Sequence, residues 1–142
     1  MDPKGVILEA VKQLGILLAG QDVNWLIGGS GALLLHGLDV TPNDIDLVVD
    51  PQAYIKAKTL LKDLLVKVAT GDTLDTPFKI NGVRGEVLAR PIKDNLLEYI
   101  DLDSVKIPVH SLKTEYEFYK NRTDNIEKNK HKLQLIEEAL QK

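Results

Sequence analysis

A glycine-rich turn followed closely by a pair of aspartates constrains the fold of this chain more than any other feature. Residues 27–31 read IGGSG, and residues 44–46 read DID. The apolar run at 23–27 predicts a buried strand that leads into the turn, and 30–36 predicts a short helix that begins there. The small residues Gly28, Gly29 and Ser30 let a phosphate approach the backbone at such a turn. The segment therefore predicts a strand, a phosphate-binding turn and a helix in succession.

The two aspartates belong to a predicted strand at 44–49, in which apolar and polar positions alternate. Asp44 and Asp46 are two residues apart, so they project from the same face, roughly 6.6 Å apart along the backbone. Glu86 lies in the only other acid-bearing segment with strand character, 83–90. A neighbouring ladder could place it beside the aspartates. We therefore expect Asp44, Asp46 and Glu86 to converge on the open face of a sheet.

The rest of the pattern predicts a single domain over residues 1–142. Pro108 makes the last strand an edge strand, because proline cannot donate to a ladder. This order of elements predicts an α/β protein of the α+β type, with a mixed twisted sheet of about four to five strands and helices mainly on one face. The other predicted elements are a first helix that ends at Gly20, a helix at 53–69, a loop at 70–77, a hairpin at 78–90 turning at Asn81 and Gly82, one or two helical turns at 95–100, a strand at 105–109, and helices at 111–119 and from 123 or 124 onward.

Clustered carboxylates beside a phosphate turn are what nucleotidyl transfer requires. Two metal ions roughly 3.5–4 Å apart hold the attacking and leaving oxygens in line and neutralise the developing charge. Mg²⁺ takes oxygen ligands and typically rests on one or two carboxylates plus substrate phosphates. Asp44 and Asp46 fit the first two ligand positions and Glu86 the third, where it could also accept the proton of the acceptor hydroxyl. The Ser30 hydroxyl adds one adaptable hydrogen bond to the donor phosphates.

These residues resemble those of the nucleotidyltransferase superfamily that includes DNA polymerase beta. In shape the chain is nearest to single-domain members such as the lincosamide and aminoglycoside adenylyltransferases. The resemblance rests on the 28–30 turn, the DID segment and Glu86, and more loosely on residues 107–112 and 119–124. It implies an enzyme that uses Mg²⁺ and a nucleoside triphosphate to place a nucleoside monophosphate on a hydroxyl acceptor and that releases pyrophosphate. The positions that match the metal acids of the family are Asp44, Asp46 and Glu86.

Composition excludes several other classes of protein. The formal net charge of -3 makes a polynucleotide partner unlikely and gives no attraction to an anionic membrane. Cysteine is absent, which excludes disulfides and thiolate ligands, and no segment approaches the roughly 20 apolar residues of a membrane span. We expect a cytoplasmic protein with a nucleoside triphosphate and an unknown hydroxyl acceptor as its ligands, and a homodimer or a partner protein is compatible with its small size.

The remaining polar residues carry weaker signals. Lys120 and Arg122 could reach the triphosphate, although a basic pair at a helix end more often complements the helix dipole. His36, His110 and His131 are scattered over three elements without metal-ligand spacing, so they are interpreted as ordinary surface or core histidines.

Two alternative functions stay open from the sequence. The first is a non-catalytic nucleotide-binding module of the same fold, for example a partner in a toxin–antitoxin pair, because the sequence shows no separate acceptor-binding domain. The second is an RNA-modifying transferase, which the slightly basic residues 104–142 permit and the overall acidity disfavours.

Overall fold

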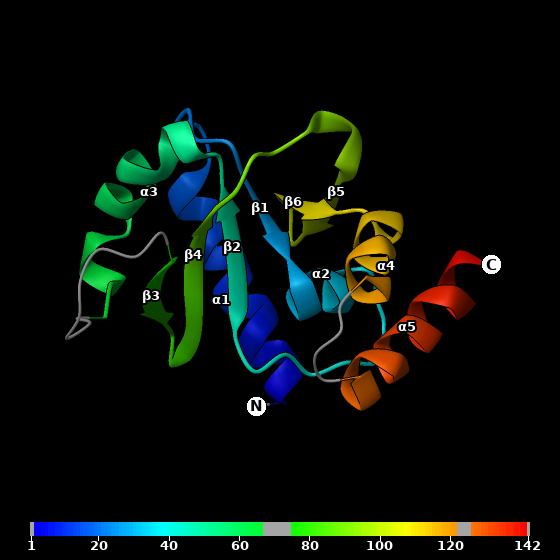
Figure 1. Cartoon of the computed structure of the whole chain (residues 1–142). Coiled ribbons are helices and arrows are strands. Elements are labelled where there is room, and N and C mark those ends of the chain that lie inside the picture. Colours follow the sequence, from blue (N-terminus) through cyan, green and yellow to red (C-terminus); the bar gives the residue numbers. More distant parts are fainter. Residues whose placement is uncertain (1, 67–74, 122–125, 142) are drawn as a thin grey trace.

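The protein builds its core on one mixed sheet, shown in a computed structural model that describes residues 2–66, 75–121 and 126–141. Six strands lie in the order β3-β4-β2-β1-β6-β5 (Figure 1). They are β1 (Trp25–Gly28), β2 (Ile45–Val49), β3 (Asp75–Ile80), β4 (Val83–Ala89), β5 (Leu97–Leu102) and β6 (Val105–His110). The α-helices among the described residues are α1 (Pro3–Leu18), α2 (Gly29–Leu35), α3 (Tyr54–Leu60), α4 (Leu112–Lys120) and α5 (Ile126–Leu140).

The sheet combines two outer hairpins with two parallel pairs and one antiparallel central pair. Strand β2 pairs antiparallel with β1 and parallel with β4, and β1 pairs parallel with β6. The β3–β4 and β5–β6 hairpins form the two outer pairs. Asn81 and Gly82, with φ of 49° and 80°, turn the β3–β4 hairpin as predicted. The α+β class and the mixed sheet predicted from the sequence are confirmed.

One face of the central strands forms the apolar core beneath α1. Ile27, Leu47, Val87 and Val109 occupy paired positions of β1, β2, β4 and β6, and all four are fully buried. Helix α1 contacts this sheet through β6 and β4. Its N-terminus is capped by Asp2, whose carboxylate accepts a hydrogen bond from the Lys4 backbone N–H. The next residue along each strand projects from the opposite face, where the candidate site lies.

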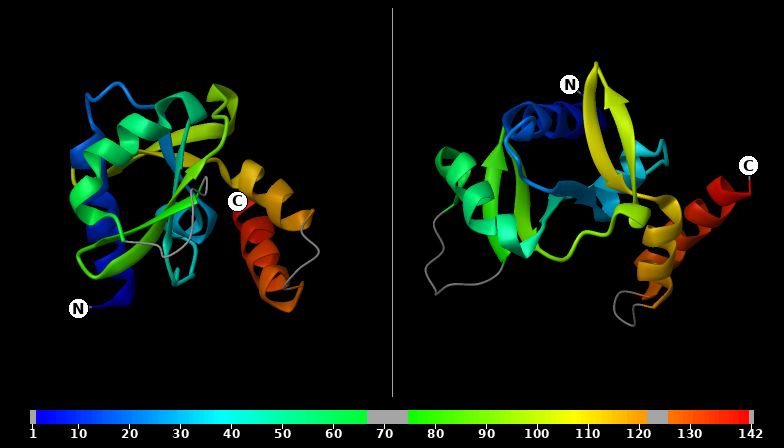
Figure 2. Two further views of the ribbon diagram at one scale, coloured as in Figure 1. Left: turned by 60° about the vertical axis from the view of Figure 1, so that its left-hand side comes forward. Right: turned by 90° about the horizontal axis from the view of Figure 1, so that it is seen from above.

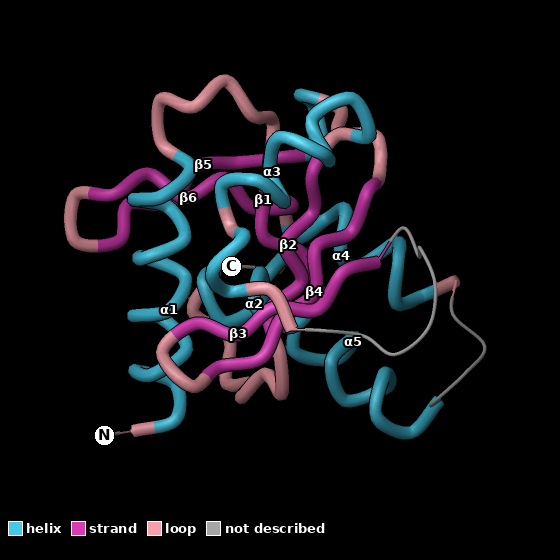
Figure 3. Tube along the Cα trace, turned by 90° about the vertical axis from the view of Figure 1, so that its left-hand side faces the viewer, coloured by secondary structure: helices cyan, strands magenta, loops and turns pink. Residues whose placement is uncertain are grey.

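Helices α4 and α5 form a separate pair. The two views of Figure 2 show them side by side, and α4 also contacts α2. Figure 3 shows α1 on one side of the strands and α5 on the other. Ser111 caps α4 by accepting a hydrogen bond from the Thr114 backbone N–H at 3.2 Å. Helix α5 packs against α4, and its C-terminal end points away from the strands (Figure 1).

The sheet has one strand more than the sequence predicted. The segment predicted as helical turns at 95–100 contains one 3-10 turn at Asp94–Leu96 and then continues as β5, which pairs with β6 from Leu97 to Leu102. Strand β6 consequently lies inside the sheet, and the prediction of an edge strand at Pro108 is wrong. The parallel ladder between β1 and β6 pairs Ile27 with Val109, the residue after Pro108. Because this ladder is short, it accommodates the proline.

Two predicted boundaries near the middle of the chain also differ. The helix predicted at 53–69 ends at Leu60, is followed by a 3-10 turn at Lys62–Leu64, and gives way to a bridge between Leu65 and Phe78. Strand β3 begins at Asp75, where a loop was predicted up to residue 77. Residues 67–74 and the predicted start of the terminal helix at 123 or 124 lie outside the described residues. In the described part of the chain, no helix has the length and apolar character needed to cross a bilayer.

Candidate functional site

One row of residues across four neighbouring strands carries the candidate site. Asp46 on β2 is paired with Glu86 on β4 and with Gly28 on β1. His110 follows Val109, the β6 partner of Ile27, and therefore lies beside Gly28. The row reads Glu86, Asp46, Gly28 and His110 from β4 to β6. Paired residues project from the same face of a sheet, so these four positions share the face opposite the apolar core.

The three predicted metal acids lie close in register but do not form a preassembled metal cage. Asp44 precedes β2 and is exposed, Asp46 is half-buried, and Glu86 is exposed. Burial, together with the negative charges of Asp44, Glu86 and Glu115, raises the pKa of Asp46 to about 6, and Lys132 opposes the shift. Among the described residues, no group of three or more His, Asp or Glu side chains has the geometry of a metal site. Their role as metal ligands therefore stays a prediction.

The glycine turn is fitted closely to Asp46. Gly29 has a φ of 62°, in the left-handed region that side chains other than glycine rarely adopt. A Cβ atom at Gly29 would also overlap the Asp46 carboxylate. Position 29 therefore has two independent reasons to be glycine. The close fit means that a group bound at the turn also lies near Asp46.

A lysine from the last helix reaches the same turn. Lys132 on α5 donates a hydrogen bond from Nζ to Ser30 Oγ at 2.7 Å, and its ammonium lies 5.2 Å from the centre of the Tyr119 ring. Lys132 could not be recognised from the sequence, because its distance along the chain from Ser30 leaves no local signal. Lys120 instead lies over the Tyr116 ring at 5.7 Å, and Arg122 is outside the described residues.

His110 and Glu115 were also missed from the sequence, and they lie in a cleft beside the row. The cleft has a volume of about 360 Å³ and is lined by Gly28, Gly29, Asp46, Val48, Leu88, Arg90, His110, Thr114, Glu115 and Phe118. His110 Nδ1 lies 2.7 Å from Glu115 Oε2. Glu115 is 2% exposed, which is unusual for a carboxylate on a helix. His110 is therefore a cleft residue.

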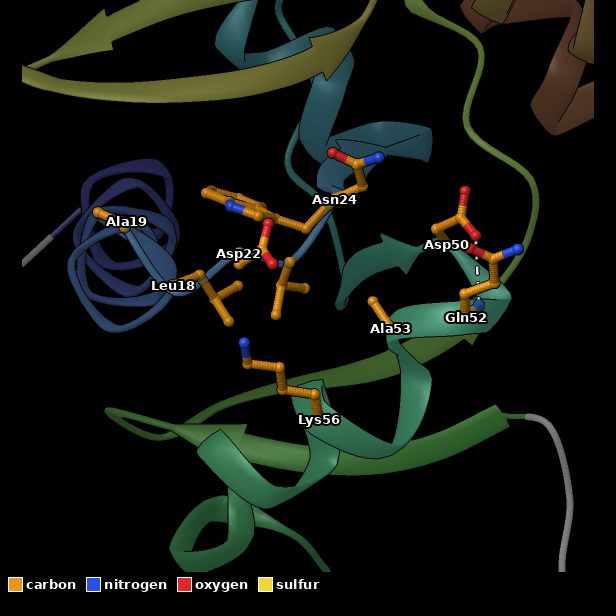
Figure 4. A pocket seen from close by; sticks show the side chains of 11 residues that line it. Leu18, Ala19, Asp22, Asn24, Asp50, Gln52, Ala53 and Lys56 are labelled. Atoms are coloured by element: carbon orange, nitrogen blue, oxygen red, sulfur yellow. Dashed lines mark hydrogen bonds between the residues drawn. The ribbon is translucent and has the colours of Figure 1, made fainter.

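A second hollow lies at the opposite end of β1 and β2, as Figure 4 shows. Its volume is about 580 Å³, and Asp22, Asn24, Asp50, Gln52 and Lys56 contribute polar groups to its wall. Asp50 accepts a hydrogen bond from the Gln52 backbone N–H and thereby caps the turn at Pro51–Ala53. None of the predicted site residues lines this hollow.

The arrangement of strands and helices matches solved structures of nucleotidyltransferases. No protein-family model matches the chain, and no curated protein matches it. The structural matches have TM-scores of 0.64 to 0.72 at 14 to 22% identity. The chain therefore has the nucleotidyltransferase fold.

Three of these structures describe the similarity most directly. An inferred nucleotidyltransferase from Thermotoga maritima has a TM-score of 0.72 and 22% identity, over 92% of each chain. The antibiotic-resistance factor ANT(2'')-Ia has a TM-score of 0.67 and 14% identity, over 99% of this chain and 86% of that one. The lincosamide adenylyltransferase LnuA, solved with lincomycin bound, has a TM-score of 0.64 and 14% identity, over 91% and 95%.

Proposed function

We propose that this protein is a Mg²⁺-dependent nucleotidyltransferase that moves a nucleoside monophosphate from a nucleoside triphosphate to a hydroxyl acceptor. The observation that carries the proposal is the row of Glu86, Asp46 and Gly28 on adjacent strands of this fold. It places carboxylates directly beside a glycine turn. Pyrophosphate would be the second product, and the cytoplasm would be the site of action.

The charge distribution around Asp46 supports a divalent cation at this place. Three further carboxylates raise its pKa, and Lys132 is the cationic group that counters them. A doubly charged ion between the acids would remove this repulsion. Asp44 and Asp46 would hold Mg²⁺ with Glu86 as the third ligand, and the bound ion would supply charge neutralisation at the reacting phosphate.

The donor phosphates would rest at Gly28, Gly29 and Ser30. A phosphate could come close to the backbone there, because two of the three positions carry no side chain, and Ser30 would contribute a hydroxyl. Lys132 already donates a hydrogen bond to this hydroxyl, so its ammonium lies next to the position proposed for the donor phosphates. Helix α5 would therefore contribute a cation to the nucleotide site from the far end of the chain.

Calorimetric titration with a non-hydrolysable nucleoside triphosphate tests the proposal. Binding should require Mg²⁺ and should be lost in Asp46→Ala, because the metal then lacks its central ligand. Glu98→Gln, which removes an exposed charge from β5, serves as the matched control and should bind like the wild type. Absence of Mg²⁺-dependent binding by the wild type would refute the proposal.

The contribution of Lys132 can be measured separately. Lys132→Gln should weaken binding of the triphosphate about tenfold or more, because one charge-assisted contact to phosphate is lost. Lys130→Gln changes an exposed lysine on the same helix and controls for the change in net charge. Equal effects of the two substitutions would show that Lys132 acts only through long-range charge.

Release of pyrophosphate then separates transfer from binding alone. A transferase supplied with Mg²⁺, a triphosphate and hydroxyl acceptors is expected to release pyrophosphate steadily. Tight binding without release, with every acceptor tested, would favour the non-catalytic module of the same fold.

A further inference from the structure

His110 and Glu115 form an ordered pair that the proposed metal and phosphate sites do not use. His110 Nδ1 and Glu115 Oε2 are 2.7 Å apart. The backbone of His110 is also fixed, since its carbonyl accepts a hydrogen bond from His36 Nε2 at 2.8 Å. Glu115 lies in the first turn of α4, where its N–H donates to the Ser111 carbonyl at 3.1 Å. Both partners are thus held by their backbones as well as by each other.

The second carboxylate oxygen of Glu115, Oε1, indicates that Glu115 has a role in ligand binding as well as in structure. Glu115 is 2% exposed, and its Oε1 is buried without a hydrogen-bond partner among the described residues. A buried carboxylate oxygen that lacks a donor is costly. Glu115 and His110 both line the cleft that also contains Gly28, Gly29 and Asp46. The volume of this cleft, about 360 Å³, is in the range of small-molecule sites.

The orientation of the imidazole leaves its other nitrogen available. A carboxylate only accepts hydrogen bonds, so the pairing with Glu115 places the proton of a neutral His110 on Nδ1. The lone pair is then on Nε2, which has no hydrogen-bond partner among the described residues. This is the arrangement in which a carboxylate orients a histidine to act as a base.

The position of His110 relative to the acids gives the pair its role. His110 lies beside Gly28 on one side, and Asp46 is paired with Gly28 on the other. A Cβ atom at Gly28 would lie 3.3 Å from His110 Nδ1, so the ring is packed against the turn that would hold the phosphates. The reacting groups would therefore lie between the acids and the imidazole.

We infer that His110 is the general base that takes the proton of the acceptor hydroxyl, and that Glu115 is its positioning residue. The inference rests on the proposed nucleotidyl transfer. His110 Nε2 accepts the hydroxyl proton while the acceptor oxygen forms a bond to the α-phosphorus. The bond from the α-phosphorus to the bridging oxygen breaks, and pyrophosphate leaves with that electron pair.

This assignment replaces the expectation that Glu86 takes the proton. Glu86 is exposed and is paired directly with Asp46, so its carboxylate belongs to the acid group that would hold the metal. His110 is two strands away from Asp46, across the glycine, and its ring is oriented by a buried carboxylate. The metal-holding and proton-accepting roles thereby fall on different side chains.

Four variants of the full chain test the inference, and each cleft variant has an exposed counterpart. His110→Gln is compared with His131→Gln, and Glu115→Gln with Glu117→Gln. Binding of a non-hydrolysable ATP analogue with Mg²⁺ should change less than twofold in all four, which also shows that they fold. Pyrophosphate release from ATP, with glycerol as the acceptor probe, should fall about 10²–10⁴-fold in His110→Gln and less in Glu115→Gln. Both exposed variants should behave like the wild type.

Two further measurements separate catalysis from a structural role. Added imidazole should restore release in His110→Ala but not in Asp46→Ala. Nitrogen NMR of labelled histidine should show the His110 proton on Nδ1 in the wild type and a changed tautomer balance in Glu115→Gln, whatever the acceptor.

The outcomes distinguish the inference from the proposed function. Release by His110→Gln at the wild-type rate, or a neutral His110 with its proton on Nε2, overturns the inference while nucleotide binding stands. A wild type that binds the analogue but releases no pyrophosphate removes the reaction in which His110 would act. A wild type that binds no nucleotide with Mg²⁺ refutes the proposed function itself.

Discussion

At the scale of single residues, the site combines side chains that the sequence reveals with others that it hides. Asp44 and Asp46 could be placed together because two residues along a strand always share a face. Glu86 followed from strand character, and its register opposite Asp46 is what a neighbouring ladder was expected to provide. No comparable rule of sequence spacing identifies His110 or Lys132. Each reaches the site through a pairing or a helix packing that no spacing along the chain encodes.

The raised pKa of Asp46 predicts a pH-dependent cost to stability. The carboxyl has a pKa of about 6 in the folded protein and an ordinary value of 3.8, so its charged form destabilises the fold at neutral pH. Asp46→Asn should raise the free energy of unfolding at pH 7.5, without metal, by about 1–3 kcal/mol. The difference should shrink as the pH falls from 6 toward 3.8, because the native carboxyl is then protonated.

Urea unfolding across this pH range, in the presence of a chelator, measures the effect. Glu98→Gln removes an exposed carboxylate from β5 and should show no comparable gain. A difference between Asp46→Asn and the wild type that is independent of pH would contradict the assignment. Added Mg²⁺ should stabilise the wild type and not Asp46→Asn.

Gly29 predicts a substitution cost with two parts. Gly29→Ala should destabilise the protein by about 1–2 kcal/mol for its left-handed backbone alone. The overlap of the new Cβ with the Asp46 carboxylate should add to this. Gly37→Ala supplies the matched control, since Gly37 has a φ of 89° and open space around a Cβ. Equal costs, measured by urea unfolding, would show that the turn and Asp46 are not tightly fitted.

At the scale of elements, the regular parts of the pattern were the predictable ones. The glycine turn lies between β1 and α2 as expected, and the Asn81-Gly82 hairpin forms where the turn residues required it. Strand β5 was missed because Leu97–Leu102 has no clean alternation: its exposed and half-buried positions mix. Its strand conformation comes from pairing with β6. The helix predicted at 53–69 stops early because Leu65 pairs with Phe78 instead.

The packing of α5 predicts that core substitutions in this helix also weaken binding at the proposed nucleotide site. Ile136 is fully buried and Leu140, on the same helix, is 47% exposed. Ile136→Ala should lower the free energy of unfolding by about 2–4 kcal/mol, whereas Leu140→Ala should lower it by about 0.5 kcal/mol or less. Loosening α5 withdraws Lys132, so Ile136→Ala should also weaken triphosphate binding as Lys132→Gln does.

Hydrogen exchange of the α5 amides reports this loosening directly. Exchange should accelerate in Ile136→Ala across α5 while the β1 and β2 amides stay protected. Unchanged nucleotide affinity in a variant with an exposed, rapidly exchanging α5 would separate Lys132 from the phosphate site.

At the scale of the whole molecule, the excess of four carboxylates over one lysine around the glycine turn predicts that triphosphate binding would depend on a divalent cation. A triphosphate alone meets the negative charges of Asp44, Asp46, Glu86 and Glu115. The fold class and the acid face were accessible from the sequence, because they follow from alternation and element order. The contributions of α4 and α5 were not, because they depend on where the helices after the sheet pack.

Thermal unfolding checks this dependence on the complete chain. Mg²⁺ together with a non-hydrolysable triphosphate at about 100 times its Kd should stabilise the fold by about 2.7 kcal/mol, which is a rise in Tm of several degrees. The triphosphate with a chelator should give little or no rise. A full rise without the cation would contradict the acid-centred site.

The ladder between β1 and β6 also affects how the protein folds during its synthesis. It joins Ile27 to Val109, so closing it brings together segments separated by most of the polypeptide. Such long-distance pairings raise the contact order and slow folding. During synthesis the glycine turn and the aspartates emerge long before β6 and the histidine that follows it. A nascent chain would therefore carry the acids early and gain its complete cleft late, after translation has passed α4.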